Sequence, residues 1–288
     1  GEDGEPAASQ YSPVNILLLG TDSRVSAGPG EWVQGGQRTD AILLLHIPAD
    51  REGAQVMSVP RDAWVPIPGH GEAKINAAYS FGGNPLLIQT FEQLTAVRVD
   101  HIAIVDFESF EELTDHLGGV TITIPETTYD LRRQETIPAG TYHMNGAEAL
   151  DYARQRFGLP GGDLDRVQRH QNWIRAMMKK ALSRDALRDP VGLRNFILTL
   201  SKSVAVDEGF SFDEIRGLAL SMLSMRASDV TFMTAPVRGL GTSADGQSIV
   251  VLDRERLAAI SRAFADDRVD EFLSENPGYL PTLGDYVR

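Results

Sequence analysis

The chain has no cysteine, and lysine is almost as scarce. The absence of cysteine excludes disulfides, thiol catalysis and cysteine-ligated zinc. Of the 27 basic residues only Lys74, Lys179, Lys180 and Lys202 are lysine, so arginine carries nearly all the positive charge. Arginine's planar fork binds phosphate oxygens in pairs. A GC-rich genome would produce the same bias, so composition alone does not assign a function to it.

Several common functional signatures are also absent. The chain contains no Gly-x-Ser-x-Gly elbow, no His-Glu-x-x-His and no phosphate loop ending in Gly-Lys-Ser/Thr, and its six histidines lack metal-ligand spacing. These gaps argue against a Ser/His hydrolase or a zinc enzyme. The net charge of −13 argues against a nucleic-acid partner, which needs a broad basic surface. No apolar run approaches the roughly 20 residues that span a bilayer.

Short apolar runs alternate with amphipathic segments along most of the chain. Residues 14–19, 41–47 and 55–59 are expected to be strands, with further strands at 101–107, 120–124, 230–233 and 249–252. The strongest helix expectations are a segment from Asn84-Pro85 to Thr95, one at 108–117, one capped by Asn145 and Glu148 that ends near Phe157-Gly158, and one at 163–187. This alternation predicts a single α/β domain with a mixed central sheet flanked by helices.

The two ends of the chain differ from its middle. Residues 1–11 are polar and rich in Gly, Pro and Ala, which predicts a linker or the remnant of a longer protein whose upstream membrane anchor is missing. A single folded domain is expected to cover residues 12–270. Residues 271–288 are predicted to be a peripheral tail.

Arginine and aspartate gather near the ends of the predicted strands. Asp22 follows the first strand, and Arg61-Asp62 follows the third, where open α/β sheets bind ligands. Arg38 and Asp40 precede the second strand, so they reach the same edge only if that strand is antiparallel to the first. A lone aspartate after a strand is usually a turn former. Together, Asp22 and Asp40 are candidate Mg²⁺ ligands beside arginines for a phosphate-rich anion.

Two further groups carry positive charge. Arg154 and Arg156 point in opposite directions on a regular helix, so both contact one ligand only if the helix ends between them. Arg166 and Arg169 lie one turn apart on the next predicted helix, a pattern that a solvated helix face also explains. Lys74 adds another charge, and Asn76 beside it is expected either to cap a helix or to orient a ligand.

In this order, the motifs resemble those of the LytR-CpsA-Psr family of cell-wall assembly proteins over residues 13–270. The resemblance rests on Leu19-Gly-Thr-Asp22, Arg38-Thr-Asp40, Ser58-Val-Pro-Arg61-Asp62, Lys74-Ile-Asn76-x-Ala-Tyr79, and Ala153-Arg154-Gln-Arg156 followed by Asp165-Arg166-x-x-Arg169. Each motif alone is weak evidence, whereas five in sequence are specific. The chain departs from the family where His170 replaces a glutamine; either His170 takes over its hydrogen bonds or Gln171 does so from a shifted helix face.

The resemblance implies an enzyme on the outer face of the cytoplasmic membrane of a Gram-positive or actinobacterial cell. Such proteins transfer a glycopolymer from a polyprenyl-pyrophosphate carrier to peptidoglycan. By resemblance, Asp22 and Asp40 hold Mg²⁺, and Arg38, Arg61 and Asp40 are catalytic. The residues implied to bind the pyrophosphate are Arg38, Arg61, Lys74, Arg154, Arg156, Arg166 and Arg169. An apolar tunnel between sheet and helices holds the lipid, with Leu87, Phe91, Ile104 and Phe107 as candidate lining residues that ordinary core packing also explains.

Two other functions fit the same residues. A polyprenyl-pyrophosphate phosphohydrolase would use the same site with water as the acceptor. A non-catalytic binding or regulatory ectodomain would hold the lipid without turnover. For a transferase, Asp40 and Asp62 are both candidate general bases, although a carboxylate that coordinates metal is a poor base.

Overall fold

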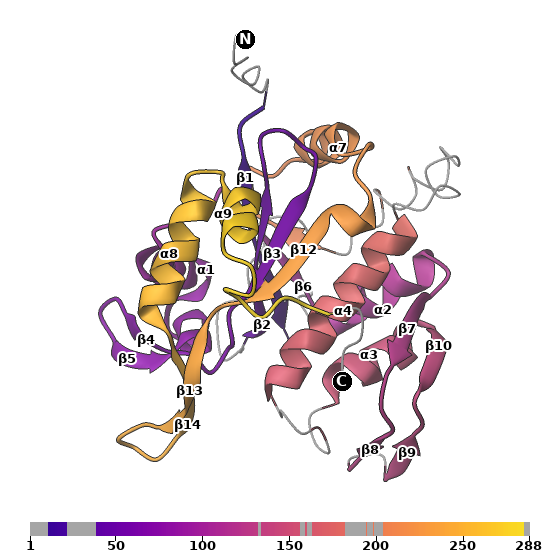
Figure 1. Cartoon of the computed structure of the whole chain (residues 1–288), viewed down its shortest axis with the longest axis horizontal. Coiled ribbons are helices and arrows are strands. Elements are labelled where there is room, and N and C mark those ends of the chain that lie inside the picture. The colour runs from indigo at the N-terminus through magenta and orange to yellow at the C-terminus, as the bar shows by residue number, and fades with distance from the viewer. Residues whose placement is uncertain are drawn as a thin grey trace.

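A six-stranded sheet in the order β11-β6-β1-β2-β3-β12 forms the centre of the molecule (Figure 1). The computed structural model describes residues 11–21, 39–131, 134–155, 159, 163–181, 194, 198 and 204–284. The strands are β1 Val14–Thr21, β2 Thr39–Ile47, β3 Ala54–Ser58, β6 His101–Val105, β11 Ala205–Val206 and β12 Val230–Thr234. β1, β3, β6 and β12 are parallel, whereas β2 and β11 run in the opposite direction. The predicted mixed sheet is therefore confirmed.

Both faces of this sheet are buried, which explains why its strands are continuous apolar runs. Leu17 and Leu19 of β1 pack on one face in a cluster that includes Leu87 and Phe91. Ile16 lies in the cluster on the other face. The first face is covered by α1 Ile75–Thr95, α8 Arg254–Ala265 and α9 Val269–Glu275, and the second by α4 Asp163–Ala181 and α7 Phe212–Ser221 (Figure 1).

A second layer of structure lies beyond α4. There α2 Phe107–His116 and α3 Gly146–Arg154 pack with the two-stranded sheet of β7 Val120–Ile124 and β10 Gly140–Met144. Trp173 of α4 enters this cluster and stacks on Phe110, with ring centroids 3.8 Å apart. Helices α2 and α3 approach so closely that a Cβ on Gly146 would lie 2.4 Å from the Glu111 carbonyl oxygen, so only glycine fits there.

Three small hairpins complete the fold, and none of them was predicted completely. They are β4 Trp64–Ile67 with β5 Gly71–Lys74, β8 Thr128–Asp130 with β9 Glu135–Ile137, and β13 Val237–Thr242 with β14 Ser248–Leu252. Only β14 was expected. The first hairpin matters for the site because it ends at Lys74 and leads directly into α1.

The structure corrects three predicted boundaries. Helix α1 begins at Ile75 rather than Asn84, and it breaks at Gly82-Gly83, where Gly83 has a φ of 64°. Asn84-Pro85 therefore opens only its second half. β6 ends at Val105 because the Asp106 side chain caps α2, accepting a 2.8 Å hydrogen bond from the Ser109 amide. α3 ends at Arg154 rather than near Phe157.

The described part of the expected tail contacts the domain. Leu280 is buried in the main apolar cluster, and the Leu283 amide donates a 2.8 Å hydrogen bond to the Phe232 carbonyl of β12. As far as Gly284, these residues are thus not peripheral; the division of the chain at residue 270 stays a prediction. None of the helices in the described ranges is long and apolar enough to cross a membrane.

Candidate functional site

Asp40 lies at the edge of the sheet where β1 and β3 end. β2 pairs antiparallel with β1, with Thr39 opposite Thr21 and Ala41 opposite Gly20. The start of β2 therefore meets the end of β1, as the position of Asp40 before its strand required. Asp22 and Arg38 lie outside the described residues, and so their predicted roles stay predictions.

Two arginines from different elements converge on the Asp40 carboxylate. Arg61, in the turn after β3, donates from Nη1 to Asp40 Oδ1, and Arg166 Nη1 of α4 lies 3.8 Å from the same oxygen. The Arg61 side chain is 12% exposed and the Arg166 side chain 8%, so both ion pairs are largely shielded from water. Shielding strengthens charge interactions relative to those on an open surface.

Lys74 extends this group of charges. Its Nζ lies 3.0 Å from Asp62 Oδ1, and Arg61 Nε lies 3.8 Å from Asp62 Oδ2. The charges thus alternate in the order Lys74, Asp62, Arg61, Asp40 and Arg166, here named the arginine cluster. Among the described residues, three cations face two carboxylates, so these five side chains together carry a net positive charge that suits an anionic ligand.

The turn between β3 and α1 holds Arg61 in position. The Ala63 amide donates to the Pro60 carbonyl at 2.9 Å, and the Asn76 amide donates to the Arg61 carbonyl at 3.2 Å. Lys74, rather than Asn76, occupies the N-cap of α1, so the helix-capping interpretation of Asn76 is wrong. Asn76 is buried, and its backbone amide, rather than its side chain, supports the backbone at Arg61.

The remaining predicted arginines do not all join the cluster. α3 ends at Arg154, and Gln155 has a non-helical ψ of 123°, which meets the requirement that the helix end between Arg154 and Arg156. Arg154 is exposed, and Arg156 lies outside the described residues. Both remain predicted ligands.

Arg169 points away from the cluster, into the protein. It is fully buried, with Nη1 donating to the Tyr152 carbonyl at 3.2 Å and to Gln155 Oε1 at 2.6 Å. Its guanidinium also lies 4.5 Å from the centre of the Tyr152 ring. These contacts tie the end of α3 to α4. The pattern of two arginines one turn apart on α4 did not reveal that Arg166 lies beside Asp40 while Arg169 binds the end of α3.

His170 and Gln171 make different contacts, and which of them replaces the family's glutamine stays a prediction. The pKa of His170 is lowered to about 4, mainly by burial and also by the Arg166 charge, while Asp40 and a hydrogen bond to the Ala153 backbone act to raise it. His170 therefore lies at the cluster as a neutral ring. Gln171 Nε2 donates to Ser58 Oγ at 2.8 Å and to the Met233 carbonyl at 2.7 Å. It fastens α4 to the ends of β3 and β12.

The candidate lipid-binding residues lie beneath this edge, in the main apolar core. Leu87 and Phe91 of α1 and Ile104 of β6 are almost completely buried in one cluster between the sheet and the helices. The Phe107 side chain lies outside the described part of the structure. A tunnel is not defined by these residues, and their contact with lipid stays a prediction.

The predicted Mg²⁺ ligands can be tested only in part. No group of three His, Cys, Asp or Glu side chains able to hold a metal ion occurs among the described residues. Mg²⁺ usually takes one or two carboxylates and completes its shell with water and substrate phosphates, so it does not need such a group. Asp40 supplies a hard oxygen donor beside the end of β1. That strand ends at Thr21, the residue before Asp22 in the sequence. The donor chemistry at this edge therefore fits the ion.

Comparison with known proteins agrees with the order of these motifs. The model of the LytR_cpsA_psr family matches residues 2–266. The chain belongs to the LytR-CpsA-Psr family. It is 36% identical over 245 residues to a probable cell wall biosynthesis protein, LcpB, of Corynebacterium glutamicum, covering 82% of this chain and 58% of the relative.

Two other curated relatives show similar identity. The cell wall biosynthesis protein LcpA of C. glutamicum is 30% identical over 283 residues, covering 85% of this chain and 54% of LcpA. The regulatory protein MsrR of Staphylococcus aureus is 32% identical, covering 88% of this chain and 75% of MsrR. The chain thus spans little more than half the length of each C. glutamicum relative.

Solved structures confirm the fold. Bacillus subtilis TagV has a TM-score of 0.74 at 22% identity, covering 90% of this chain and 98% of TagV. TagT bound to LIIa-WTA has a TM-score of 0.70 at 26% identity, covering 89% of this chain and 91% of TagT. As a member of this family, the chain has the mixed α/β fold expected from its sequence.

Proposed function

We propose that this protein transfers a glycopolymer from a polyprenyl-pyrophosphate carrier to peptidoglycan. The arginine cluster carries the proposal, because it gathers Arg61, Arg166 and Lys74 beside Asp40 and Asp62 at the ligand-binding edge of the sheet. A pyrophosphate presents several anionic oxygens, so it would compete with Asp40 for both guanidinium groups. Arginine suits this exchange, because its fork binds phosphate and carboxylate with the same geometry.

The relatives support a role in cell-wall assembly. The two C. glutamicum proteins are named for cell wall biosynthesis, and TagT has been solved with LI-WTA and with LIIa-WTA, which are wall teichoic acid ligands. For this chain we extend that role to a glycopolymer donor and a peptidoglycan acceptor. The proposed setting is the outer face of the cytoplasmic membrane, reached through an anchor outside this chain.

The proposed reaction is a phosphoryl transfer. An acceptor hydroxyl oxygen bonds to the phosphorus nearer the glycopolymer, and the bond from that phosphorus to the bridging oxygen breaks. The bridging oxygen keeps the electron pair and leaves as polyprenyl phosphate. Arg61 and Arg166 stabilise the negative charge that grows on the bridging oxygen as it leaves, while Lys74 adds to the positive field. His170, being neutral, adds no charge of its own.

Asp40 and Asp22 are the residues that would hold Mg²⁺. When bound, the ion supplies further neutralisation of phosphate charge. The acceptor hydroxyl gives its proton to a base, and Asp62 suits this step better than Asp40 when Asp40 holds the metal. Lys74 and Arg61, which both contact Asp62, keep its carboxylate at the edge of the cluster.

Substitution of Arg61 tests this function. We expect Arg61→Ala to lower turnover of a polyprenyl-pyrophosphate glycan with Mg²⁺ by about 10²–10³-fold, the effect of losing one donor to transition-state charge. Turnover is measured as lipid phosphate released and as glycan joined to peptidoglycan fragments. Arg98→Ala is the matched control, because the Arg98 side chain is 85% exposed and lies away from the cluster. Circular dichroism checks that both variants fold.

The same assay separates the two rival functions. If lipid phosphate forms equally fast without acceptor and no glycan is joined to peptidoglycan, the protein is a phosphohydrolase. If the wild-type chain binds the lipid but shows no turnover at any Mg²⁺ concentration, it is a binding or regulatory module. In either case the transferase proposal is wrong.

A further inference from the structure

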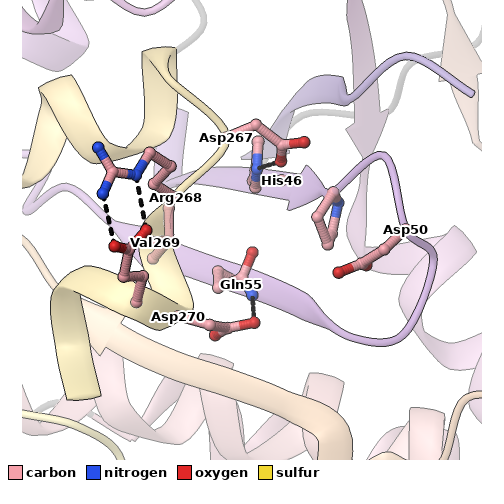
Figure 2. Close-up of a pocket in the computed structure, with 9 residues that line it drawn as sticks. His46, Asp50, Gln55, Asp267, Arg268, Val269 and Asp270 are labelled. Carbon is pink, nitrogen blue, oxygen red and sulfur yellow. Dashed lines mark hydrogen bonds and ion pairs between the residues drawn. The ribbon is translucent and has the colours of Figure 1, made fainter. Parts of the chain in front are cut away.

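A separate pocket opens at the opposite end of β2 and β3 from the arginine cluster. It has a volume of ≈ 200 Å³ and lies between the β2–β3 turn and the segment that joins α8 to α9 (Figure 2). Asp40 and His46 are six residues apart on β2, so the two ends lie roughly 20 Å from each other at the usual rise per strand residue. The pocket is therefore distinct from the proposed transfer site.

A buried histidine fixes one wall of this pocket. His46 is 1% exposed, and its Nε2 lies 2.9 Å from Asp267 Oδ1. Its Nδ1 lies 2.7 Å from Oδ1 of the Asn15 side-chain amide, so each ring nitrogen contacts a polar group. The other Asp267 oxygen, Oδ2, accepts a 3.0 Å hydrogen bond from the Ala49 amide. Burial lowers the pKa of His46, against the raising effect of Asp267, so the ring does not neutralise the acidic residues nearby.

Gln55 supplies an unused acceptor in the floor of the pocket. Its Nε2 donates to Asp270 Oδ2 at 2.8 Å, which fixes the amide orientation, because a flipped amide would place two acceptor oxygens together. Gln55 is 1% exposed, and no described group donates a hydrogen bond to its buried Oε1. Figure 2 shows this oxygen turned away from Asp270 and into the pocket. A buried carbonyl oxygen without a donor is costly, so it marks the place for a ligand donor.

The rest of the lining is mainly acidic. Asp50, Asp267, Asp270 and Glu271 contribute four carboxylates, whereas Arg268 is the only arginine or lysine among the nine lining residues. That guanidinium is already bound to Glu271, with Nε 2.6 Å from Oε2. The pocket thus offers acceptors and negative charge, and it needs a ligand that brings donors and positive charge.

We infer that this pocket binds a primary ammonium group, carried by a small amine or by a lysine side chain. An ammonium group has three N–H donors and no acceptor, which suits Gln55 Oε1 between the carboxylates of Asp50 and Asp270. A metal ion fits less well. Both ring nitrogens of His46 and both oxygens of Asp267 already contact protein groups, so they are not open for coordination.

Amide NMR of the whole chain tests this inference. Titration with n-butylammonium chloride should shift the signals of Gln55 and of residues 267–270 to saturation. Tetramethylammonium chloride, which has the same charge but no N–H, should give no saturating shift. A short lysine-containing peptide distinguishes the sources of the group: binding at least about tenfold tighter than butylammonium indicates a polypeptide ligand, and equal binding indicates a free amine.

Two variants and a control locate the site. Asp270→Asn keeps an acceptor for Gln55 but removes the charge, and Gln55→Met removes Oε1 at similar volume; each should weaken butylammonium binding by about tenfold or more. Asp270 is exposed, so Asp270→Asn remains informative if Gln55→Met does not fold. Glu275→Gln, on the same helix but outside the lining, should bind as the wild type does.

Three results would overturn the inference. Equal shifts with tetramethylammonium would indicate a diffuse charge effect. Saturation by Mg²⁺ or Ca²⁺ at these residues without any by butylammonium would indicate a metal site. The lack of saturation by any of the probes would show that the pocket holds only water.

Discussion

At one end of β2 and β3 the described charged groups are mainly cationic, and at the other end they are mainly anionic. At one end, Lys74, Arg61 and Arg166 surround two aspartates. At the other, four carboxylates surround Arg268, which is itself bound to Glu271. The net charge of −13 therefore agrees with the pocket but does not describe the arginine cluster. A local anion site exists in this acidic chain because three separate elements bring cations to the same strand edge.

Each end also has a histidine kept neutral by burial, but the neighbours act in opposite directions. At His170, the positive charge of Arg166 adds to the effect of burial and lowers the pKa further. At His46, the Asp267 carboxylate opposes burial. Burial is thus the main cause that keeps both histidine rings neutral. The neighbouring charge differs: it is positive where we propose an anionic ligand and negative where we propose an ammonium group.

The largest expected effect separates the two arginines of α4. Arg169→Met should lower the free energy of unfolding by about 2–3 kcal/mol, because the Tyr152 carbonyl and Gln155 Oε1 lose a charged, buried donor. Arg166→Met should change stability much less and should instead abolish most of the turnover. Urea unfolding and the transfer assay are measured on both variants.

Lys180→Met provides the control on the same helix, because Lys180 is exposed at its end. If Arg169→Met unfolds like the wild type but loses turnover, Arg169 belongs to the arginine cluster and its buried position here is not the working one.

The sequence predicted the mixed central sheet and the placement of Asp40 and Arg61 at one edge of it. Continuous apolar strands predicted a doubly covered sheet, and the position of Asp40 before its strand predicted that β2 would be antiparallel to β1. Local spacing on a helix was less informative. Arg166 and Arg169 look equivalent at one-turn spacing, yet one faces the charges and the other is covered by Tyr152. That difference depends on where α3 packs, which no local pattern specifies.

The pocket at the other end could not be predicted, for a similar reason. His46 and Asp267 are 221 residues apart, and their pairing depends on how α8 returns to the sheet. His46 reads as one more member of an apolar strand, and Asp267 as a loop aspartate. In α1 a local pattern predicts too much: Asn84-Pro85 has the features of a helix start, yet it lies in the middle of the element, just after the Gly82-Gly83 break.

Acid should destabilise the protein through both histidines. In each case the folded-state pKa is below the ordinary value of 6.5, so between these values the unfolded chain binds more protons. The stability that each neutral ring contributes is complete above about pH 6.5 and is lost as pH falls, for His170 down to about 4. Urea unfolding is measured from about pH 7.5 to 5, where the carboxylates contribute least to the slope.

Variants show which histidine causes the change of unfolding free energy with pH. His46→Gln and His170→Gln should each flatten the loss of stability below about pH 6.5, and Asp267→Asn should steepen it, because removing that carboxylate lowers the pKa of His46 further. A slope that is unchanged in both histidine variants would mean that neither ring is held neutral by the fold.

The smallest expected effect concerns His170 itself. His170→Gln should leave transfer within about threefold of the wild type, less than 1 kcal/mol in the barrier. A glutamine amide can donate to the Ala153 carbonyl as the ring does, and replacing a neutral ring leaves the charge beside Arg166 unchanged. His170→Ala, which removes the donor, should lose more activity than His170→Gln. A loss above about tenfold in folded His170→Gln would instead assign the imidazole a chemical step, and the two ends of the sheet would then differ in the work of their histidines as well as in charge.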